Sequence, residues 1–209
     1  MEKSMQCRFF AFGLVPLLTA MVLLAPSAGW AQSSPSDIVA AFHESLLGVM
    51  KKAKTLGVKG RFEKLASPLK QSFHFRLMTQ VAVSSYWRKA NQAQIDRLVD
   101  AFTRLSISTY ASRFDGYSGQ SFETEGEKPG PQKTILVMTR IIDPGSDPVE
   151  LTYVTRKIKG EWRIIDVLLD TGISELAVRR SEYRRVLKTG GIDGLIDTLN
   201  RKVDQLLNP

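Results

Sequence analysis

The chain has 209 residues and carries 29 lysines and arginines against 21 aspartates and glutamates, a formal net charge of +8. A single cysteine, Cys7, excludes a framework of internal disulfides. The basic balance favours anionic partners, such as nucleic acid, an anionic membrane surface or an acidic protein.

Residues 1–31 have the organisation of a cleavable signal peptide. Lys3 and Arg8 precede an almost entirely apolar run from Phe9 to Ala25, and small residues at Gly29 and Ala31 follow it. The alternative is a membrane anchor, but the apolar run is close to the lower limit of roughly 20 residues for a spanning helix. We therefore expect export and cleavage near Ala31.

Cleavage would leave residues 32–209 as a single domain with 27 basic and 20 acidic residues, a net charge of +7 and no cysteine. This length is sufficient for one domain with a hydrophobic core. The loss of Cys7 also excludes thiol catalysis and thiolate metal sites. In an exported protein we expect no nucleic acid partner, and lipid headgroups or an acidic protein become the preferred readings of the charge.

Helical periodicity marks the first part of this domain. Ser36 is the expected N-cap of the first helix, and Gly57 is its expected end. Asn91 is positioned to cap the most strongly amphipathic helix of the chain, which is expected to end near Gly116.

The pattern then changes to short β-rich runs separated by turn signals. Four strands are predicted, at 120–127, 133–142, 149–159 and 161–169, forming one antiparallel sheet. Helical spacing returns at 173–187 and 192–207, with Gly190 and Gly191 between the two segments. Helices, a run of strands and further helices predict an α+β fold.

Few residues suggest chemistry. His43 and His74 lie far apart in the sequence and neither has a second ligand at helical spacing, so we expect no metal and no cofactor. No G-x-S-x-G motif is present. The acid of most interest is Asp166, which is predicted to share a strand face with Trp162, Ile164 and Leu168. It is either a catalytic acid inside a cone-shaped fold or a buried acid paired with a basic residue.

Several short segments, in order along the chain, resemble the MlaC family, also called the toluene-tolerance auxiliary family. These are periplasmic lipid-binding proteins of Gram-negative bacteria. The resemblance is carried by five segments: Tyr86-Trp87-Arg88, Gln92–Phe102, Thr109-Tyr110-Ala111, Gly160–Val167 and Gly190–Ile196. The match covers essentially the whole of the domain.

One segment departs from the phospholipid-carrying members of that family. About four additional residues, near one helical turn, lie between Ser174 and the pair Tyr183-Arg184. This version is similar to the hopanoid-associated branch, HpnM, so the resemblance leaves phospholipid and hopanoid open as ligands.

The resemblance implies a cone-shaped fold related to nuclear transport factor 2, with an apolar pocket between a four-stranded antiparallel sheet and its flanking helices. It also implies a soluble periplasmic lipid carrier that is not an enzyme. Its partners would be an inner-membrane lipid transporter, an outer-membrane complex as a further candidate, and the membrane surface in transient contact. Two alternatives stay open, namely a small enzyme using Asp166 and a structural partner of an export complex.

Twelve residues are expected to line the lipid pocket. They are Phe75, Met78, Val81, Tyr86, Leu98, Phe102, Leu105, Tyr110, Met138, Tyr153, Trp162 and Ile164.

Overall fold

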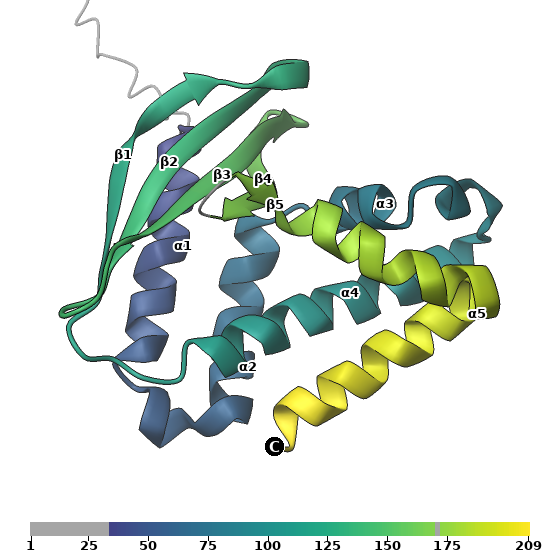
Figure 1. Ribbon diagram of the computed structural model, residues 1–209, viewed down its shortest axis with the longest axis horizontal. Coiled ribbons are helices and arrows are strands. Elements are labelled where there is room, and N and C mark those ends of the chain that lie inside the picture. Colours follow the sequence, from purple (N-terminus) through teal and green to yellow (C-terminus); the bar gives the residue numbers. More distant parts are fainter. Residues whose placement is uncertain (1–33, 170–171) are drawn as a thin grey trace, which may run out of the picture. The chain divides into compact units, whose positions relative to one another are not determined.

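The computed structural model describes residues 34–169 and 172–209, so the predicted signal peptide at 1–31 lies outside the described residues. Helices precede and follow a run of strands, which confirms the α+β class (Figure 1). The helices are α1 (Pro35–Met50), α2 (Ala53–Ser72), α3 (Phe75–Val83), the 3-10 helix η1 (Ser84–Lys89), α4 (Gln92–Arg113) and α5 (Glu175–Leu207).

The strands form one antiparallel sheet in the order β1-β2-β3-β4-β5. They are β1 (Ser121–Pro129), β2 (Thr134–Ile142), β3 (Val149–Ile158), β4 (Glu161–Leu169) and β5 (Ile173–Ser174), with the 3-10 turn η2 (Pro131–Lys133) after β1. The predicted number of four strands was wrong. The fifth strand has only two residues, which pair with Leu168 and Leu169, and two residues are too few to show strand periodicity.

The start of α1 differs from the sequence expectation. Its N-cap is Ser34, whose hydroxyl accepts from the amide of Asp37 at 3.1 Å, while the Ser34 amide donates to the Asp37 carboxylate at 2.7 Å. Ser36, the expected cap, instead donates from its amide and hydroxyl to Glu127, at 2.8 and 2.6 Å. These bonds connect the start of α1 to β1.

Two other helix boundaries follow from local chemistry. Asn91 is the N-cap of α4, as expected, and its side chain accepts from the amide of Gln94 at 2.9 Å. Gly57 does not end α1. It lies inside α2 with φ 59°, where it marks a kink.

A short non-helical break joins α2 and α3 to the sheet. Phe73 forms an isolated parallel bridge with Ile164 of β4, and the amide of His74 donates to the Ile164 carbonyl at 2.9 Å. The His74 side chain then caps α3 by accepting from the amide of Leu77 at 3.1 Å. This segment therefore fixes where the first residues of α3 lie against β4.

The C-terminal end of α4 is held by a buried cation. Arg61 of α2 donates to the carbonyl of Ala111 at 2.7 Å and to the carbonyl of Ala53 at 2.9 Å. Carbonyl oxygens near a helix C-terminus are favourable partners for a positive charge. The bonds fix the last turn of α4 relative to α2.

One buried apolar cluster extends through α1 to α5 and through β2 to β4. Its largest fully buried side chains include Phe42, Leu65, Phe102 and Tyr153. In the described part of the chain, no helix combines the length and the apolar character needed to cross a membrane.

The long helix α5 changes direction at Gly191, which has φ 61° and ψ −157°. This backbone conformation is accessible almost only to glycine. Gly191→Ala is expected to lower the free energy of unfolding by about 1–3 kcal/mol, measured by urea denaturation.

Gly194 offers the matched control on the same helix. An added Cβ there would meet nothing within 4 Å, and Gly194 does not have a positive φ. Gly194→Ala is expected to be neutral or to stabilise the protein by up to about 1 kcal/mol. Equal effects of the two substitutions would contradict the assignment of strain to Gly191.

Candidate functional site

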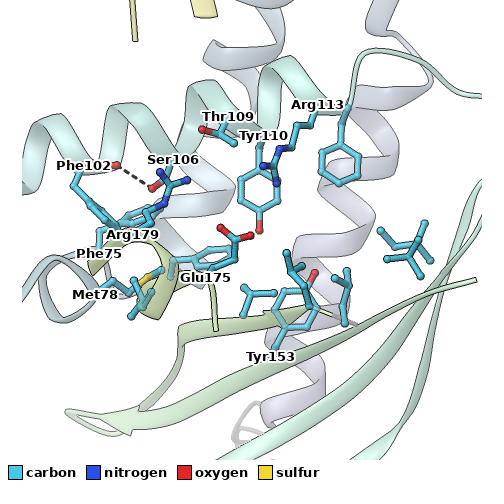
Figure 2. Close-up of a pocket in the computed structure, with 18 residues that line it drawn as sticks. Phe75, Met78, Phe102, Ser106, Thr109, Tyr110, Arg113, Tyr153, Glu175 and Arg179 are labelled. Carbon is cyan, nitrogen blue, oxygen red and sulfur yellow. Dashed lines mark hydrogen bonds between the residues drawn. The ribbon is translucent and has the colours of Figure 1, made fainter. Parts of the chain in front are cut away.

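A cavity of about 230 Å³ lies between the sheet and helices α3, α4 and α5 (Figure 2). Most of its wall is apolar, and polar groups come from α4 and from the first turns of α5. The lining residues are Phe73, Phe75, Met78, Phe102, Ser106, Thr109, Tyr110, Arg113, Phe114, Ile141, Val149, Leu151, Tyr153, Val167, Leu169, Glu175, Leu176 and Arg179.

The sheet presents one face of three strands to this cavity. Val149, Leu151 and Tyr153 alternate along β3, so they point to the same side. The register places Val167 opposite Tyr153 and Leu169 opposite Leu151. Alternation thus produces a continuous apolar wall on the side of the sheet that faces the helices.

Helix α4 supplies the opposite wall with side chains at helical spacing. Phe102, Ser106, Tyr110 and Arg113 follow one another about one turn apart, and all line the cavity. The wall therefore changes along the helix from apolar at Phe102 to charged at Arg113. The hydroxyl of Ser106 donates back to the carbonyl of Phe102 at 2.9 Å, so it is already satisfied.

Aromatic rings form one part of the cavity wall. The rings of Phe73 and Phe75 are stacked, with centroids 5.7 Å apart and an interplanar angle of 11°. The centroids of Phe75 and Phe102 lie 6.3 Å apart, and Phe73 is perpendicular to Phe42 with centroids 5.1 Å apart. These rings are buried, and Met78 beside them has a flexible side chain that adapts to irregular shapes.

A second, more open hollow of about 540 Å³ borders two of the same phenyl rings. It shares Phe73 and Phe75 with the cavity, and its remaining lining is largely polar, including Arg76, Asp96 and Arg163. The stacked pair thus borders both an apolar cavity and a hollow with charged lining.

The buried polar residues His43 and Tyr153 connect α1 to the strand wall of the cavity. The hydroxyl of Tyr153 and Nε2 of His43 lie 2.9 Å apart, and the His43 ring stacks on Phe122. Burial lowers the pKa of His43 to about 4 and raises the pKa of Tyr153 well above its usual value. His43 is therefore neutral at pH 7, and the pair forms an uncharged contact between α1 and β3.

The polar edge of the cavity combines charges of both signs. Figure 2 shows the carboxylate of Glu175 directed towards the Tyr110 hydroxyl, with the guanidinium groups of Arg113 and Arg179 on either side. Burial raises the pKa of Tyr110. The charge of Glu175 raises it further, whereas the charges of Arg113 and Arg179 lower it. The three charged groups thus act on one hydroxyl, while none of them forms an ion pair within the described part of the chain.

Five of the twelve residues expected at the pocket lie in the wall of this cavity, and they come from α3, α4 and β3. They are Phe75, Met78, Phe102, Tyr110 and Tyr153. The structure brings them together through the Phe73–Ile164 bridge and the alternation of β3. Their role in lipid binding stays a prediction.

Three of the other seven belong to the solid core of the protein. Leu98, Leu105 and Ile164 are at most 3% exposed and do not line the cavity. Leu98 and Leu105 of α4 pack against other buried side chains, and Ile164 is the partner of Phe73 in the isolated β-bridge. Apolar periodicity marks a buried face, but it does not distinguish a filled face from a hollow one.

The remaining four lie away from the cavity. Val81 is 45% exposed on the outer side of α3, and Tyr86 lies under the ammonium of Lys89 in η1. Met138 pairs with Thr152, on the face of the sheet opposite Val137 and Tyr153. Trp162 pairs with Lys157 at the far end of the β3–β4 hairpin.

Several lining residues were missing from the sequence-based list. Val149, Leu151, Val167 and Leu169 follow the alternation that identified Tyr153, so strand periodicity was a usable signal for them. The charged residues Arg113, Glu175 and Arg179 carried no such signal, because charged residues at helix ends are usually solvated.

Asp166 has a structural position. It accepts from the amide of Leu176 at 3.1 Å and from the hydroxyl of Ser174, and it does not line the cavity. The predicted strand face was wrong for Trp162 and Ile164, because Ile165 is an extra residue that shifts the register between Ile164 and Asp166, whereas Leu168 shares the face of Asp166. The carboxylate therefore anchors the start of α5.

Within residues 34–169 and 172–209, no group of three or more histidine, cysteine or acidic side chains is arranged to hold a metal ion. The described residues thus form an α+β domain in which a sheet and helices enclose an apolar cavity with a charged edge. Comparison with known families identifies this arrangement. The family model described as "MlaC protein" matches residues 41–201, and the chain belongs to the MlaC family.

Two relatives illustrate the similarity. The chain is 28% identical over 127 residues to the intermembrane phospholipid transport system binding protein MlaC of Haemophilus influenzae, a match that spans 59% of each protein. A solved structure of the phospholipid-binding protein from Ralstonia solanacearum, in complex with a phospholipid, superposes with a TM-score of 0.73 and 21% identity. That superposition covers 83% of this chain and 99% of the Ralstonia chain, so the two proteins share a fold.

The buried His43 predicts a specific dependence of stability on pH. The unfolded chain takes up a proton at the usual histidine pKa of 6.5, whereas the folded chain does so only near pH 4. The free energy of unfolding is therefore expected to decrease as the pH falls from 6.5 to 4, by on the order of 3 kcal/mol from this residue.

His43→Leu removes the titrating group, and the slope between pH 6.5 and 4 is expected to become shallower in urea denaturation series. Ala41→Leu introduces the same side chain at an exposed position of α1 and should keep the wild-type slope. Identical slopes for His43→Leu and wild type would contradict the assignment.

Proposed function

We propose that this protein is a periplasmic lipid carrier, which binds a phospholipid or a hopanoid in the cavity and shuttles it between membrane transport complexes. The observation that carries the proposal is a mostly apolar cavity, lined in part by aromatic rings, with charges confined to one edge. Membership of the MlaC family supports it, as do the phospholipid transport and phospholipid binding for which the Haemophilus and Ralstonia proteins are named.

The physical requirement on such a carrier is large. Burying one methylene is worth ~0.8 kcal/mol, so a two-chain lipid with ~30 methylenes requires on the order of 24 kcal/mol of burial. A carrier must replace nearly all of this while the lipid is outside a membrane. Phe73, Phe75, Met78 and Phe102 provide surfaces that interact with acyl chains without competing polar groups.

The volume of the cavity indicates how a lipid would be accommodated. About 230 Å³ is less than the roughly 300–1,000 Å³ of pockets that hold drug-sized ligands. A two-chain lipid therefore requires the walls to separate. We place this movement at Phe73 and Phe75, because displacement of these rings would join the cavity to the second hollow.

The hopanoid reading rests on about four additional residues within the segment between Ser174 and Tyr183, which forms the first two turns of α5. Glu175, Leu176 and Arg179 of this segment line the cavity, so the lengthened segment contributes to the wall. A rigid polycyclic lipid requires a broader cavity than acyl chains do. We propose the HpnM-like branch as the part of the family in which this chain belongs.

The partners we propose are an inner-membrane lipid transporter, an outer-membrane complex as a second candidate, and membrane surfaces in transient contact. The net charge of +7 on residues 32–209 supports contact with anionic headgroups.

We propose export by the signal peptide at 1–31, cleaved near Ala31, and a single domain at 32–209.

Catalysis by Asp166 is disfavoured, because its carboxylate accepts hydrogen bonds from Ser174 and Leu176 at the start of α5.

Ser106→Phe tests the carrier function. Ser106 lines the cavity from α4, and its side chain bonds only to its own helix, so a phenyl ring would fill the cavity without removing a core contact. The lipid recovered from the purified variant, after incubation with phospholipid vesicles or with vesicles that also contain hopanoid, is expected to fall several-fold. Mass spectrometry of the extracted lipid gives both its amount and its class.

Ala93→Phe is the matched control, since Ala93 is exposed on the same helix and does not line the cavity. It should load lipid like the wild type. Failure of the wild-type protein to take lipid from either vesicle, and to retain any from its native host, would contradict the proposed function.

A further inference from the structure

The edge of the cavity contains three charged side chains of both signs. Arg113 extends from the last turn of α4, and Glu175 and Arg179 lie one helical turn apart on α5. Figure 2 shows all three directed into the same space beside Tyr110. Both helix segments are fixed from outside the cavity, α4 by the Arg61 bond to Ala111 and α5 by Asp166.

These charges are not paired with one another. No ion pair within the described residues includes Arg113, Glu175 or Arg179. Figure 2 shows all three around the Tyr110 hydroxyl, whose pKa their charges change. Cationic and anionic groups are therefore both available to a ligand.

A lipid that enters the cavity would displace water from this edge. A half-buried carboxylate that loses its water is costly unless a cation or a hydrogen-bond donor replaces that water. Guanidinium groups, in turn, are well suited to phosphate oxygens, to which they donate two hydrogen bonds in a plane. The ligand that satisfies both requirements carries a phosphate and an ammonium close together.

We infer that Arg113, Glu175 and Arg179 recognise a zwitterionic headgroup of the phosphoethanolamine type, with the phosphate on the two arginines and the ammonium on Glu175. This inference rests on the proposed carrier function and adds a preference to it. An anionic glycerol headgroup would leave Glu175 without a cation. A neutral lipid without phosphate would leave both arginines without an anion.

The test uses vesicles that contain equal amounts of phosphatidylethanolamine and phosphatidylglycerol with the same acyl chains. Wild-type protein incubated with them is expected to extract ethanolamine lipid in about two- to five-fold excess, the effect of one partly solvated ion pair. The lipid that Glu175→Gln takes up should have the ratio of the vesicle, because the neutral amide no longer attracts an ammonium.

Glu182→Gln is the matched control, since it removes the same charge from an exposed position of α5 outside the cavity. It should keep the preference. The inference is overturned if wild type takes up the two lipids equally, or if Glu175→Gln keeps the preference, while carriage of lipid still stands. Failure to take up any lipid would instead contradict the carrier function.

A further arm separates a lipid headgroup from a free phosphate ester. Glycerophosphoethanolamine has the same headgroup but no acyl chains, and it should not displace bound lipid at an equal concentration. Displacement would assign the three charges to a small phosphate ester and would overturn the inference.

Discussion

The hydrogen bond from the His74 amide to the Ile164 carbonyl is the contact on which the site depends. It fixes the break between α2 and α3 against β4, where Phe73 forms a bridge to the same residue. Because the break is fixed, Phe73 and Phe75 stand on either side of one anchored residue. Their stacked rings line both the cavity and the second hollow.

The cavity has an apolar inner wall and a charged edge, and only the charged edge requires hydration. Its inner wall consists of buried apolar and aromatic side chains, whose interaction with a ligand is nondirectional. Its edge carries Arg113, Glu175 and Arg179, which need water or counter-charges. Such a gradient orients any amphiphilic ligand, with its apolar part inside and its polar part at the edge. The adaptable side chain of Met78 permits more than one chain shape inside.

Asp166 and His43, which the sequence offered as candidates for chemistry, both have structural roles. Asp166 accepts hydrogen bonds from the start of α5 and so sets the direction in which Glu175 and Arg179 project. His43 is a neutral partner of Tyr153 inside the wall. Asp166 and His43 both support the structure around the cavity, and neither of these two residues lines it.

The sequence by itself determined the class of the fold, four of the five strands and the cap of α4, because side-chain period, turn residues and capping chemistry act over a few neighbouring residues. It also identified four residues of α3 and α4 that line the cavity, the aromatic residues Phe75, Phe102 and Tyr110 and the methionine Met78. Only the tertiary structure decided which apolar faces enclose a space. Leu98 and Phe102 have the same period and similar burial, yet only Phe102 borders the cavity, since that depends on what packs opposite each of them. The extra residue Ile165 and the two-residue strand β5 were likewise decided by pairing between strands, which no local pattern records.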